Sequence, residues 1–371
     1  MKVLLDLYYL NAATTGIKTY MLELASAARK YTHPEVEWIF THDPSTQATL
    51  PNKGKLSKLQ RLQFHLDYFK WKEFQLPDLV KKYQPDVLIC PDFVSPAASL
   101  PCKRFTVFHD AFFWQMPENY PRWWRKYFLG LIKKGLKEQT SLVTTTEYSK
   151  RCLEEFLGKN WPMKVIYQTY KGLHGAADIH FLSKNHLQKQ GYFLHIGTFD
   201  RRKNLPFLVE AYAKYLSQSK EKKKLVLAGG EGQSRQMNDF PLVKQLIDSF
   251  GIQDQVLLPG YLEEGEIKAL YQGAFGYIFP SLNEGFGIPL LESMDFGVPV
   301  IHSNQAALME VAGLAGLCFP LGDLHELSEK MILLEQENDL RTRLSQLGKA
   351  RVKEFSAENF IDSFHKLILS A

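Results

Sequence analysis

The chain has 371 residues, and its content of 45% hydrophobic and 23% charged residues is typical of a globular protein with about two domains. Its formal net charge of +5 is the sum of +8 in residues 1–180 and −3 in the remainder, and this bias is too weak to indicate a nucleic-acid-binding protein. The sequence contains no run of about 18 apolar residues, so it predicts no membrane-spanning helix.

The N-terminus and the cysteines predict a cytoplasmic protein. The first apolar run, residues 1–10, contains Asp6 and lacks a cleavage site of small residues, so we interpret it as a β-strand and not as a signal peptide. The 4 cysteines have neither CxxC spacing nor the density of a disulfide framework, and we expect reduced thiols.

Strand-like runs alternate with segments of helical periodicity along the chain. This pattern predicts an α/β fold with parallel sheets, arranged as two doubly wound Rossmann-like domains that face each other across a cleft. The expected strands of the first half are residues 3–9, 36–42, 86–90, 105–109, 142–146 and 164–168. Those of the second half are residues 192–198, 224–228, 255–259, 276–280, 299–302 and 317–320.

An aperiodic segment, residues 169–190, is rich in Gly, Ala, His and Asn and places the domain boundary. We predict an N-terminal domain over residues 1–175 and a C-terminal domain over residues 176–355. The final residues, 356–371, are expected to form a helix that packs back on the N-terminal domain.

Two positions in the first half are candidates for ligand contact. Gly16 follows the first strand, just before a helix expected to open at about Lys18, and could allow close approach of the backbone to a ligand. His109, with Asp110 beside it, ends the fourth strand and could exchange a proton near neutral pH. A lone histidine at a strand end is, however, more often structural.

Two segments of the first half, residues 122–137 and 53–71, are basic and aromatic at helical spacing. The second contains Phe64, Tyr68 and Phe69. Each segment is either a helix that packs on the core with a solvated basic face, or an interfacial helix that contacts an anionic membrane or a lipid-linked acceptor.

Cations cluster at the start of the second half. A strand that begins at Tyr192 ends in a glycine turn, and Arg201, Arg202 and Lys203 then precede a helix that begins near Asn204. Positive charges ahead of a helix N-terminus oppose its dipole and need an anion nearby. A diphosphate would supply that anion, and the alternative is solvated surface charge.

Two further strand ends carry weaker signals. Residues 225–232 run into a glycine-rich turn, which closes many strands. Residues 256–264 end in a turn and an acidic helix start, whose backbone could contact the edge of a nucleotide base, although an ordinary loop explains it equally well.

The most informative segment, residues 284–292, reads Glu-Gly-Phe-Gly-Ile-Pro-Leu-Leu-Glu and follows a strand. It predicts a loop and then a helix, with Pro289 at the helix start and Gly297 just past its end. Unpaired N–H groups and the helix dipole favour an anion there, most simply a phosphate. Glu284 in the loop and Glu292 in the first helical turn could both face this ligand. A capped surface helix with incidental acids is the alternative.

With these motifs, the chain resembles the family 4 glycosyltransferases, which are retaining enzymes of the GT-B fold. The resemblance covers nearly the whole chain, is strongest over residues 192–320, and rests on the highly specific Glu-x7-Glu signature. Residues 197–205, residues 143–150 and the His109–Asp110 strand end also match the family layout. Two departures are the single Gly16, where the family often has two glycines, and Asp200–Arg201 in place of its usual Glu-Pro.

The resemblance implies roles for individual residues. Arg202 and Lys203 would bind the donor diphosphate, and together with His109 and Glu284 they would form the catalytic set. Glu292 would hold the ribose hydroxyls of the nucleotide. The further donor contacts that the resemblance implies are Gly16 and Gly197 near the diphosphate, Tyr261 and Leu262 beside the base, Gly285, Phe286 and Gly287 at the sugar, and Ile288 and Leu290 at the helix start.

The activity that the resemblance implies is transfer of a sugar from a nucleoside-diphosphate sugar to a glycan or lipid-linked acceptor in cell-surface polysaccharide synthesis. The C-terminal domain would bind the donor and the N-terminal domain the acceptor, with peripheral contact at the inner face of the membrane. No Asp-x-Asp motif stands at a strand end, so we expect no metal and no other cofactor.

Two alternatives remain. One is a nucleotide-sugar epimerase on the same scaffold, and the other is a nucleotide-sugar-binding protein without turnover.

Overall fold

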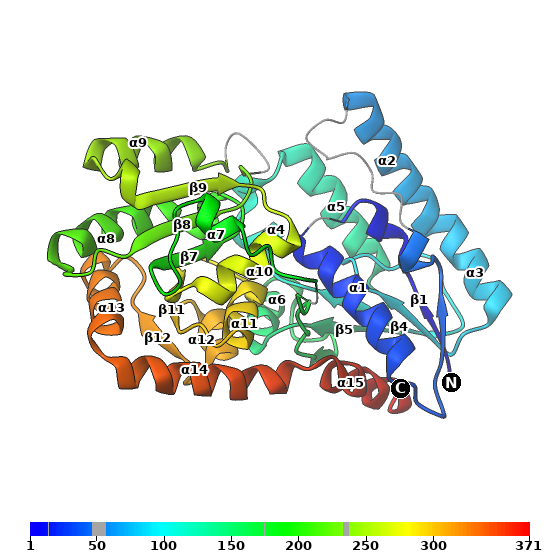
Figure 1. Cartoon of the computed structure of the whole chain (residues 1–371). Helices are drawn as coiled ribbons and strands as arrows, with labels where there is room; N and C mark the ends of the chain where they lie inside the picture. Colours follow the sequence, from blue (N-terminus) through cyan, green and yellow to red (C-terminus); the bar gives the residue numbers. More distant parts are fainter. Residues whose placement is uncertain (14, 47–56, 138, 174, 233–236) are drawn as a thin grey trace. The chain divides into compact units, whose positions relative to one another are not determined.

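The computed structural model describes residues 1–13, 15–46, 57–137, 139–173, 175–232 and 237–371. They form two compact units (Figure 1). Unit 1 comprises Met1–Tyr170 and Phe355–Ala371, and unit 2 comprises Lys171–Glu354. The chain therefore leaves unit 1 inside the aperiodic segment 169–190 and returns to it for its last helix.

Unit 1 contains a six-stranded sheet of order β2-β1-β3-β4-β5-β6, and every pair of neighbours is parallel. Its strands are β1 (Lys2–Leu5), β2 (Glu37–Phe40), β3 (Val87–Cys90), β4 (Lys103–Phe108), β5 (Thr140–Thr144) and β6 (Met163–Val165). Its helices are α1 (Thr15–Lys30), α2 (Lys58–Lys70), α3 (Leu76–Tyr83), α4 (Phe112–Gln115), α5 (Arg122–Gly135), α6 (Glu147–Leu157) and α15 (Ala357–Leu369). A π-helical turn, η4 (Trp71–Gln75), joins α2 to α3.

Side-chain alternation explains why both faces of this sheet are covered. Val3 and Leu5 pack in a cluster with residues of α1 and α15, whereas Leu4 and Leu88 pack with Trp71 and residues of α3. Successive strand residues point to opposite faces, and in an all-parallel sheet both faces are buried by helices. The strands therefore appear in the sequence as continuous apolar runs.

Unit 2 contains a second six-stranded parallel sheet, of order β12-β11-β10-β7-β8-β9. Its strands are β7 (Tyr192–Ile196), β8 (Lys224–Ala228), β9 (Val256–Gly260), β10 (Gly276–Phe279), β11 (Val300–Ser303) and β12 (Gly316–Phe319). Its helices are α7 (Phe181–Lys184), α8 (Leu205–Gln218), α9 (Phe240–Phe250), α10 (Glu264–Gly273), α11 (Ile288–Asp295), α12 (Ala306–Ala312), α13 (Leu324–Gln336) and α14 (Asn338–Val352). One face of the sheet packs against α8, α9 and α13.

The predicted α/β class is confirmed, and each of the twelve predicted strands has a counterpart in the structure. Several strands end earlier than predicted. The first ends at Leu5 because Tyr8–Asn11 form a 3-10 turn, and the fifth ends at Thr144 because Thr146 caps α6 through Ser149 N. These loop residues are as apolar or β-branched as the strands before them, so composition alone does not locate the strand end.

In each sheet, the order in which strands are added reverses at one place. The reversal lies between β1 and β3 in unit 1 and between β7 and β10 in unit 2, and we call these places the two switch points. Loops that leave such neighbouring strands diverge, and ligands of doubly wound sheets bind where this happens, beyond the carboxyl ends of the strands. The loops after β7 and β10 therefore define the candidate site of unit 2.

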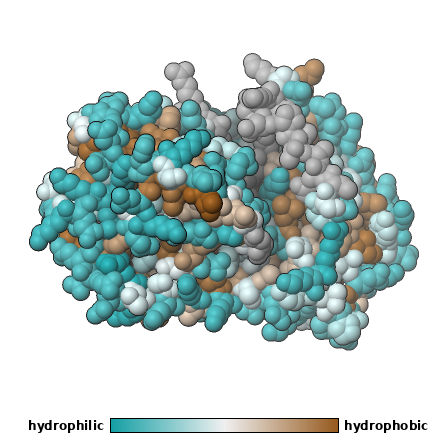
Figure 2. Space-filling view, viewed as in Figure 1, coloured by the Kyte–Doolittle hydropathy of each residue, from teal (hydrophilic) through white to brown (hydrophobic). Residues whose placement is uncertain are grey.

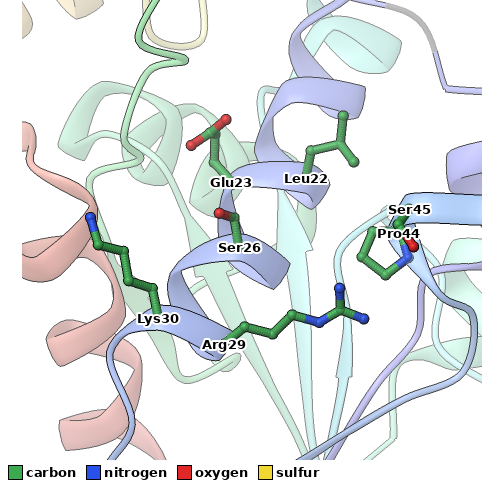
Figure 3. Close-up of a pocket in the computed structure, with 7 residues that line it drawn as sticks. All are labelled: Leu22, Glu23, Ser26, Arg29, Lys30, Pro44 and Ser45. Atoms are coloured by element: carbon green, nitrogen blue, oxygen red, sulfur yellow. The ribbon is translucent and has the colours of Figure 1, made fainter. Parts of the chain in front are cut away.

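A cavity of about 450 Å³ lies elsewhere in unit 1, on the flank of α1 (Figure 3). Glu23, Ser26 and Lys30 line it from the second half of α1, and Arg29 points toward Ser45. Because α1 runs from the carboxyl edge of the sheet back to its amino edge, this cavity is away from the unit 1 switch point.

Candidate active site

Arg202, Lys203 and Glu284 meet at the unit 2 switch point. Arg202 Nη1 lies 2.7 Å from Glu284 Oε2, and Lys203 Nζ lies 2.6 Å from Glu284 Oε1. The two cations come from the 3-10 turn η6 (Arg201–Lys203) after β7, and Glu284 comes from the loop after β10. Since β7 and β10 are paired, segments far apart in the sequence form one cluster.

Burial and charge set the ionisation of this cluster. Burial alone would raise the pKa of the Glu284 carboxyl, but the positive charges of Arg202 and Lys203 outweigh it and lower that pKa to about 2. Burial, together with the charge of Arg202, lowers the pKa of Lys203 to about 8. At pH 7 all three side chains are therefore charged, and one positive charge is in excess.

Glycines let the loop after β7 pack tightly on the loop after β8. Gly229 has φ +143°, and a Cβ at this position would lie 1.9 Å from the carbonyl oxygen of Gly197. The amide of Gly197 donates to Ala228 O at 2.9 Å, and the amide of Phe199 donates to Gly230 O at 3.0 Å. The glycine-rich turn that carried a weak signal in the sequence thus supports the segment that leads to Arg202 and Lys203.

The three adjacent cations point in different directions. The Arg201 side chain is exposed and lies 3.7 Å from Asp239, whereas Arg202 and Lys203 reach Glu284. A backbone hydrogen bond of 2.8 Å from Leu282 N to Arg202 O ties the two site loops together. The resemblance assigned Arg202 and Lys203, but not Arg201, to the diphosphate. Neighbouring side chains of a 3-10 turn lie about 120° apart, so Arg201 and Arg202 take different directions.

The loop after β10 leads directly into α11. Gly287 precedes the helix with φ +106°, a conformation that favours glycine, and Gly297 follows it with φ +72° as predicted. Phe286 and Leu290 are buried, while Gly285 and Ile288 are half-buried. The amide of Leu290 already donates to Gly287 O at 3.0 Å within the first turn.

Glu292 lies in the second turn of α11, so its predicted place in the first turn is wrong. The helix starts at Ile288, and the residues before Ile288 belong to the loop. Glu292 Oε2 accepts a hydrogen bond of 3.0 Å from the Tyr271 hydroxyl, and burial raises the pKa of the Glu292 carboxyl to about 7. Because the Tyr271 hydrogen bond and the charge of Lys171 only partly offset the burial, Glu292 differs from Glu284 in being easily protonated.

The residues predicted to flank a base lie just after β9, the edge strand of the sheet. Tyr261 is 80% exposed, whereas Leu262 is buried. In the sheet order, β8 separates β9 from β7. The two residues are therefore not part of the Arg202–Lys203–Glu284 cluster itself.

The predicted residues of unit 1 are placed as follows. His109 directly follows β4 and is buried, and its Nε2 lies 2.8 Å from Pro91 O. Burial lowers the pKa of His109 to about 4, which disfavours the expected proton exchange near neutral pH. Gly16 is exposed in the first turn of α1, which starts at Thr15 and not near Lys18, and no described side chain or backbone lies within 4 Å of its Cβ position.

A second charged cluster, which the sequence analysis missed, lies at the unit 1 switch point. Lys72 Nζ is 2.7 Å from Asp6 Oδ2 and 2.7 Å from Asp92 Oδ1. The Trp71 indole N–H donates to Asp6 at 3.0 Å, and the Tyr68 hydroxyl donates to Asp92 at 2.9 Å. Two acids within two residues of the ends of the first and third strands were a usable signal. The lysine was not, because it lies in a π-helical turn that breaks the helical periodicity.

Across the described ranges, no group of three or more His, Cys, Asp and Glu side chains is arranged to hold a metal ion. The metal independence expected from the sequence remains a prediction.

Comparison with known proteins gives consistent matches over both units. Residues 178–351 match the family model for glycosyl transferases group 1, and residues 14–169 match the model for glycosyltransferase family 4. O-antigen chain mannosyltransferase B of Escherichia coli is 27% identical over 382 residues, which cover 97% of each chain.

Another relative comes from Campylobacter jejuni. It is the GalNAc-alpha-(1->4)-GalNAc-alpha-(1->3)-diNAcBac-PP-undecaprenol alpha-1,4-N-acetyl-D-galactosaminyltransferase, which is 27% identical over 99% of this chain and 98% of its own length.

Solved structures share the fold at low sequence identity. Sucrose-phosphate synthase from Thermosynechococcus elongatus has a TM-score of 0.73 at 17% identity, and Anabaena HepE in complex with UDP and glucose has a TM-score of 0.70 at 15% identity. Each similarity covers 100% of both chains. The predicted GT-B fold is thereby confirmed.

Proposed function

Because this chain belongs to family 4 of the glycosyltransferases, we propose that it transfers a sugar from a nucleoside-diphosphate sugar to a glycan or lipid-linked acceptor, with retention of the anomeric configuration. The observation that carries this proposal is the cluster of Arg202, Lys203 and Glu284 at the unit 2 switch point. The names of the two relatives, an O-antigen chain enzyme and one with a PP-undecaprenol substrate, support a role in cell-surface polysaccharide synthesis.

The charges of the cluster suit the leaving group. Breaking the bond between the anomeric carbon and the diphosphate oxygen builds negative charge on the diphosphate. A guanidinium has five N–H donors and an ammonium group has three, and Arg202 and Lys203 each direct one donor at Glu284. Glu284 holds both cations in place before the substrate arrives, so little reorganisation is needed when charge develops.

Retention can be achieved in two ways. The acceptor hydroxyl attacks the anomeric carbon from the face that the diphosphate leaves, and its proton passes to the diphosphate oxygen, or a covalent sugar–enzyme intermediate forms first. Both oxygens of Glu284 are engaged by cations. This favours for Glu284 a role in holding the cations and contacting the sugar over a role as nucleophile.

The other site residues have supporting roles. Glu292, ionised above pH 7, accepts hydrogen bonds from the ribose hydroxyls of the donor. His109, which is neutral at pH 7, offers a hydrogen-bond acceptor to a sugar hydroxyl.

Activity assays with a panel of donors test the proposal. The purified protein is incubated with uridine- and guanosine-diphosphate sugars, the mannose donors first, with and without a lipid-linked oligosaccharide. We expect release of nucleoside diphosphate that depends on the acceptor, and a product whose anomeric configuration, measured by NMR, is that of the donor. Conversion of the donor sugar without acceptor would indicate an epimerase, and donor binding without any turnover would indicate a binding protein.

We propose that the reaction needs no metal ion, since Arg202 and Lys203 supply positive charge where the diphosphate binds. Turnover is therefore expected to be unchanged by EDTA. A loss of turnover in EDTA that added Mg²⁺ restores would contradict this.

Unit 1 carries a face suited to a membrane surface. Within the described part of the chain, none of the helices combines the length and the hydropathy needed to cross a bilayer. On α2, three leucines at helical spacing are exposed, Leu59, Leu62 and Leu66. Trp123 of α5 is also exposed, and its ring lies 6.5 Å from the ring of His65 on α2. On the face shown in Figure 2, hydrophobic residues form separate patches among hydrophilic ones.

Basic side chains accompany this apolar face on α5. Those that are exposed are Arg122, Lys126, Lys133 and Lys134. Meanwhile Phe128, Leu131 and Ile132 of the same helix pack on the core. The two interpretations of residues 122–137 therefore apply to opposite faces of one helix. Of the segment 53–71, residues 53–56 lie outside the described residues.

We propose that α2 and α5 rest on an anionic membrane, with leucines in the interface and cations at the headgroups. Cosedimentation with vesicles that contain an anionic phospholipid tests this. We expect binding that Leu62→Ser with Leu66→Ser weakens and that Leu314→Ser, at an even more exposed leucine of unit 2, leaves unchanged. Equal binding to zwitterionic vesicles, or equal binding of the double variant, would contradict the proposal.

A further inference from the structure

The turn formed by Pro91, Asp92 and Phe93, just after β3, connects the buried cluster of unit 1 to His109. The Pro91 carbonyl lies 2.8 Å from His109 Nε2. The Asp92 carboxylate accepts hydrogen bonds from Lys72 Nζ at 2.7 Å and from the Tyr68 hydroxyl at 2.9 Å. Asp92 and Lys72 are both buried.

Phe93 has a backbone conformation that other contacts must stabilise. Its φ of 69° lies in the left-handed region, which a bulky residue rarely adopts, and such strain persists only where the surroundings over-determine it. Here the Phe93 amide donates to Val107 O in β4 at 3.1 Å, and its ring packs 5.4 Å from the ring of His109 and 5.5 Å from that of Phe108. These contacts therefore fix the position of the turn relative to β4, the strand that ends just before His109.

The turn also decides which nitrogen of His109 carries the proton. A carbonyl oxygen can only accept a hydrogen bond, so Nε2 must donate to Pro91 O. In the neutral ring, Nδ1 is then the acceptor. The main chain of His109 is held as well, because Thr145 Oγ1 donates to His109 O at 3.1 Å, and the Tyr20 ring stands 4.7 Å from the imidazole at 82°.

We propose that Lys72 and Asp92 are positioning residues for His109: their buried ion pair holds the turn, and the turn fixes the orientation and the tautomer of the imidazole. The atom presented to the substrate is then Nδ1, which accepts a hydrogen bond from a sugar hydroxyl and does not supply a proton. The claim about turnover rests on the proposed function, whereas the claim about the imidazole does not.

The cluster supplies its own control. Lys72 forms ion pairs with both Asp92 and Asp6. Asp92 belongs to the turn that contacts His109, and Asp6 does not. Asp6 accepts from the Trp71 indole N–H, and Trp71 stacks on Tyr8 at 4.7 Å. Trp71→Phe removes one hydrogen bond to a buried aspartate, as Tyr68→Phe does, but on the side away from the turn. Each variant therefore removes one hydrogen bond from a buried aromatic side chain to an aspartate, and the two differ in their link to His109.

Nitrogen NMR of the full chain labelled with ¹⁵N-histidine measures the tautomer of the imidazole directly. The variant His109→Gln assigns the signal, because that signal is then lost. In the wild type we expect His109 as a single neutral tautomer protonated on Nε2 between pH 5 and 8. In Asp92→Asn we expect a mixture of tautomers, and in Tyr68→Phe a smaller shift in the same direction. Trp71→Phe should give the wild-type spectrum. A His109 signal that is unchanged in Asp92→Asn and Tyr68→Phe overturns the proposal, as does an equal change in Trp71→Phe.

Kinetic measurements give a second test, which distinguishes a positioning role of Asp92 from a purely structural one. Asp92→Asn should lower kcat about tenfold with little change in the KM for the donor, and it should cause no further loss in a His109→Gln background. Equal losses in both backgrounds would show that Asp92 does not act through His109. If the protein has no transferase activity, the proposed function fails while the NMR result still decides the claim about the imidazole. If Asp92→Asn does not fold, Tyr68→Phe gives the same two readouts.

Discussion

Each sheet has one switch point with a cluster of charged side chains, and the two clusters differ in the sign of their net charge. In unit 2, Arg202 and Lys203 surround the carboxylate of Glu284, and in unit 1 the carboxylates of Asp6 and Asp92 surround Lys72. The first cluster has an excess positive charge and the second an excess negative charge. Topology therefore determines where a site can form, whereas the local charge determines which ligand it accepts. We therefore expect an anionic diphosphate to bind at the unit 2 switch point and not at the unit 1 switch point.

The clusters also differ in access. Side-chain exposure is 21% for Arg202, 8% for Lys203 and 9% for Glu284, but 0% for Lys72, 0% for Asp6 and 1% for Asp92. A ligand can reach the cations of unit 2, whereas the charges of unit 1 are sealed and already paired. We interpret the first as a binding cluster and the second as a cluster that fixes the structure around it.

The largest expected effect is on turnover in unit 2. Lys203→Ala should lower kcat/KM about 10³-fold, because a preorganised charge that stabilises the leaving group is lost. Arg201→Ala is the matched control: this neighbouring cation is exposed and directed at Asp239, so its loss should change kcat/KM less than about twofold. Similar losses in both variants, or wild-type rates in Lys203→Ala and Glu284→Gln alike, would contradict the assignment of the site.

Stability should show the reverse pattern. Lys72→Met leaves Asp6 and Asp92 buried together without a cation and should lower the free energy of unfolding by about 3–5 kcal/mol. Lys203→Met should cost much less, because Glu284 keeps its ion pair with Arg202. Urea denaturation measures both values. A larger loss in Lys203→Met than in Lys72→Met would reverse the roles given to the two clusters.

The sequence predicted the fold class and the neighbourhood of the site better than the details of either. Apolar runs located the twelve strands, but their order in the sheet depends on packing between distant segments. The Glu-x7-Glu signature pointed to Glu284 and Glu292. It did not show that Glu284 pairs with two cations, or that Glu292, in the second turn of α11 and not the first, accepts a hydrogen bond from Tyr271.

Burial explains the errors in unit 1. His109 was expected to titrate near neutrality because the sequence does not reveal that Phe93 and Tyr20 enclose its ring. Lys72 was missed because a lysine within a polar helix is ordinarily solvated, and only the meeting of β1, β3 and η4 surrounds it with acids. Long-range contacts of this kind have no local signature.

Glu284→Gln should separate binding from catalysis. Removing the carboxylate frees Arg202 and Lys203 from an internal anion, so affinity for a nucleoside diphosphate should rise about tenfold even as turnover falls. Isothermal titration calorimetry of the purified variant measures the affinity. Weaker binding than in the wild type would mean that Glu284 contributes to the diphosphate site in another way.

A smaller effect is expected from pH. Burial raises the pKa of Glu292 to about 7 and lowers that of Lys203 to about 8, so the ionised carboxylate and the protonated amine coexist best between these values. kcat/KM should therefore fall as pH decreases below about 7 and as it increases above about 8, by up to about tenfold per pH unit. Glu292→Gln should remove the acidic limb, and Lys203→Arg the alkaline limb. Limbs that persist in both variants would assign the titration to other groups.

The central claim is that the cations of the unit 2 switch point hold a diphosphate, and thermal denaturation with a panel of nucleoside diphosphates tests it most directly. A ligand that binds the folded state raises the melting temperature, and the rise is larger for a tighter or more concentrated ligand. We predict that one nucleoside diphosphate raises the melting temperature of the wild type and of Arg201→Ala by the same amount, and that Lys203→Ala loses this rise. An equal rise in Lys203→Ala would contradict the account.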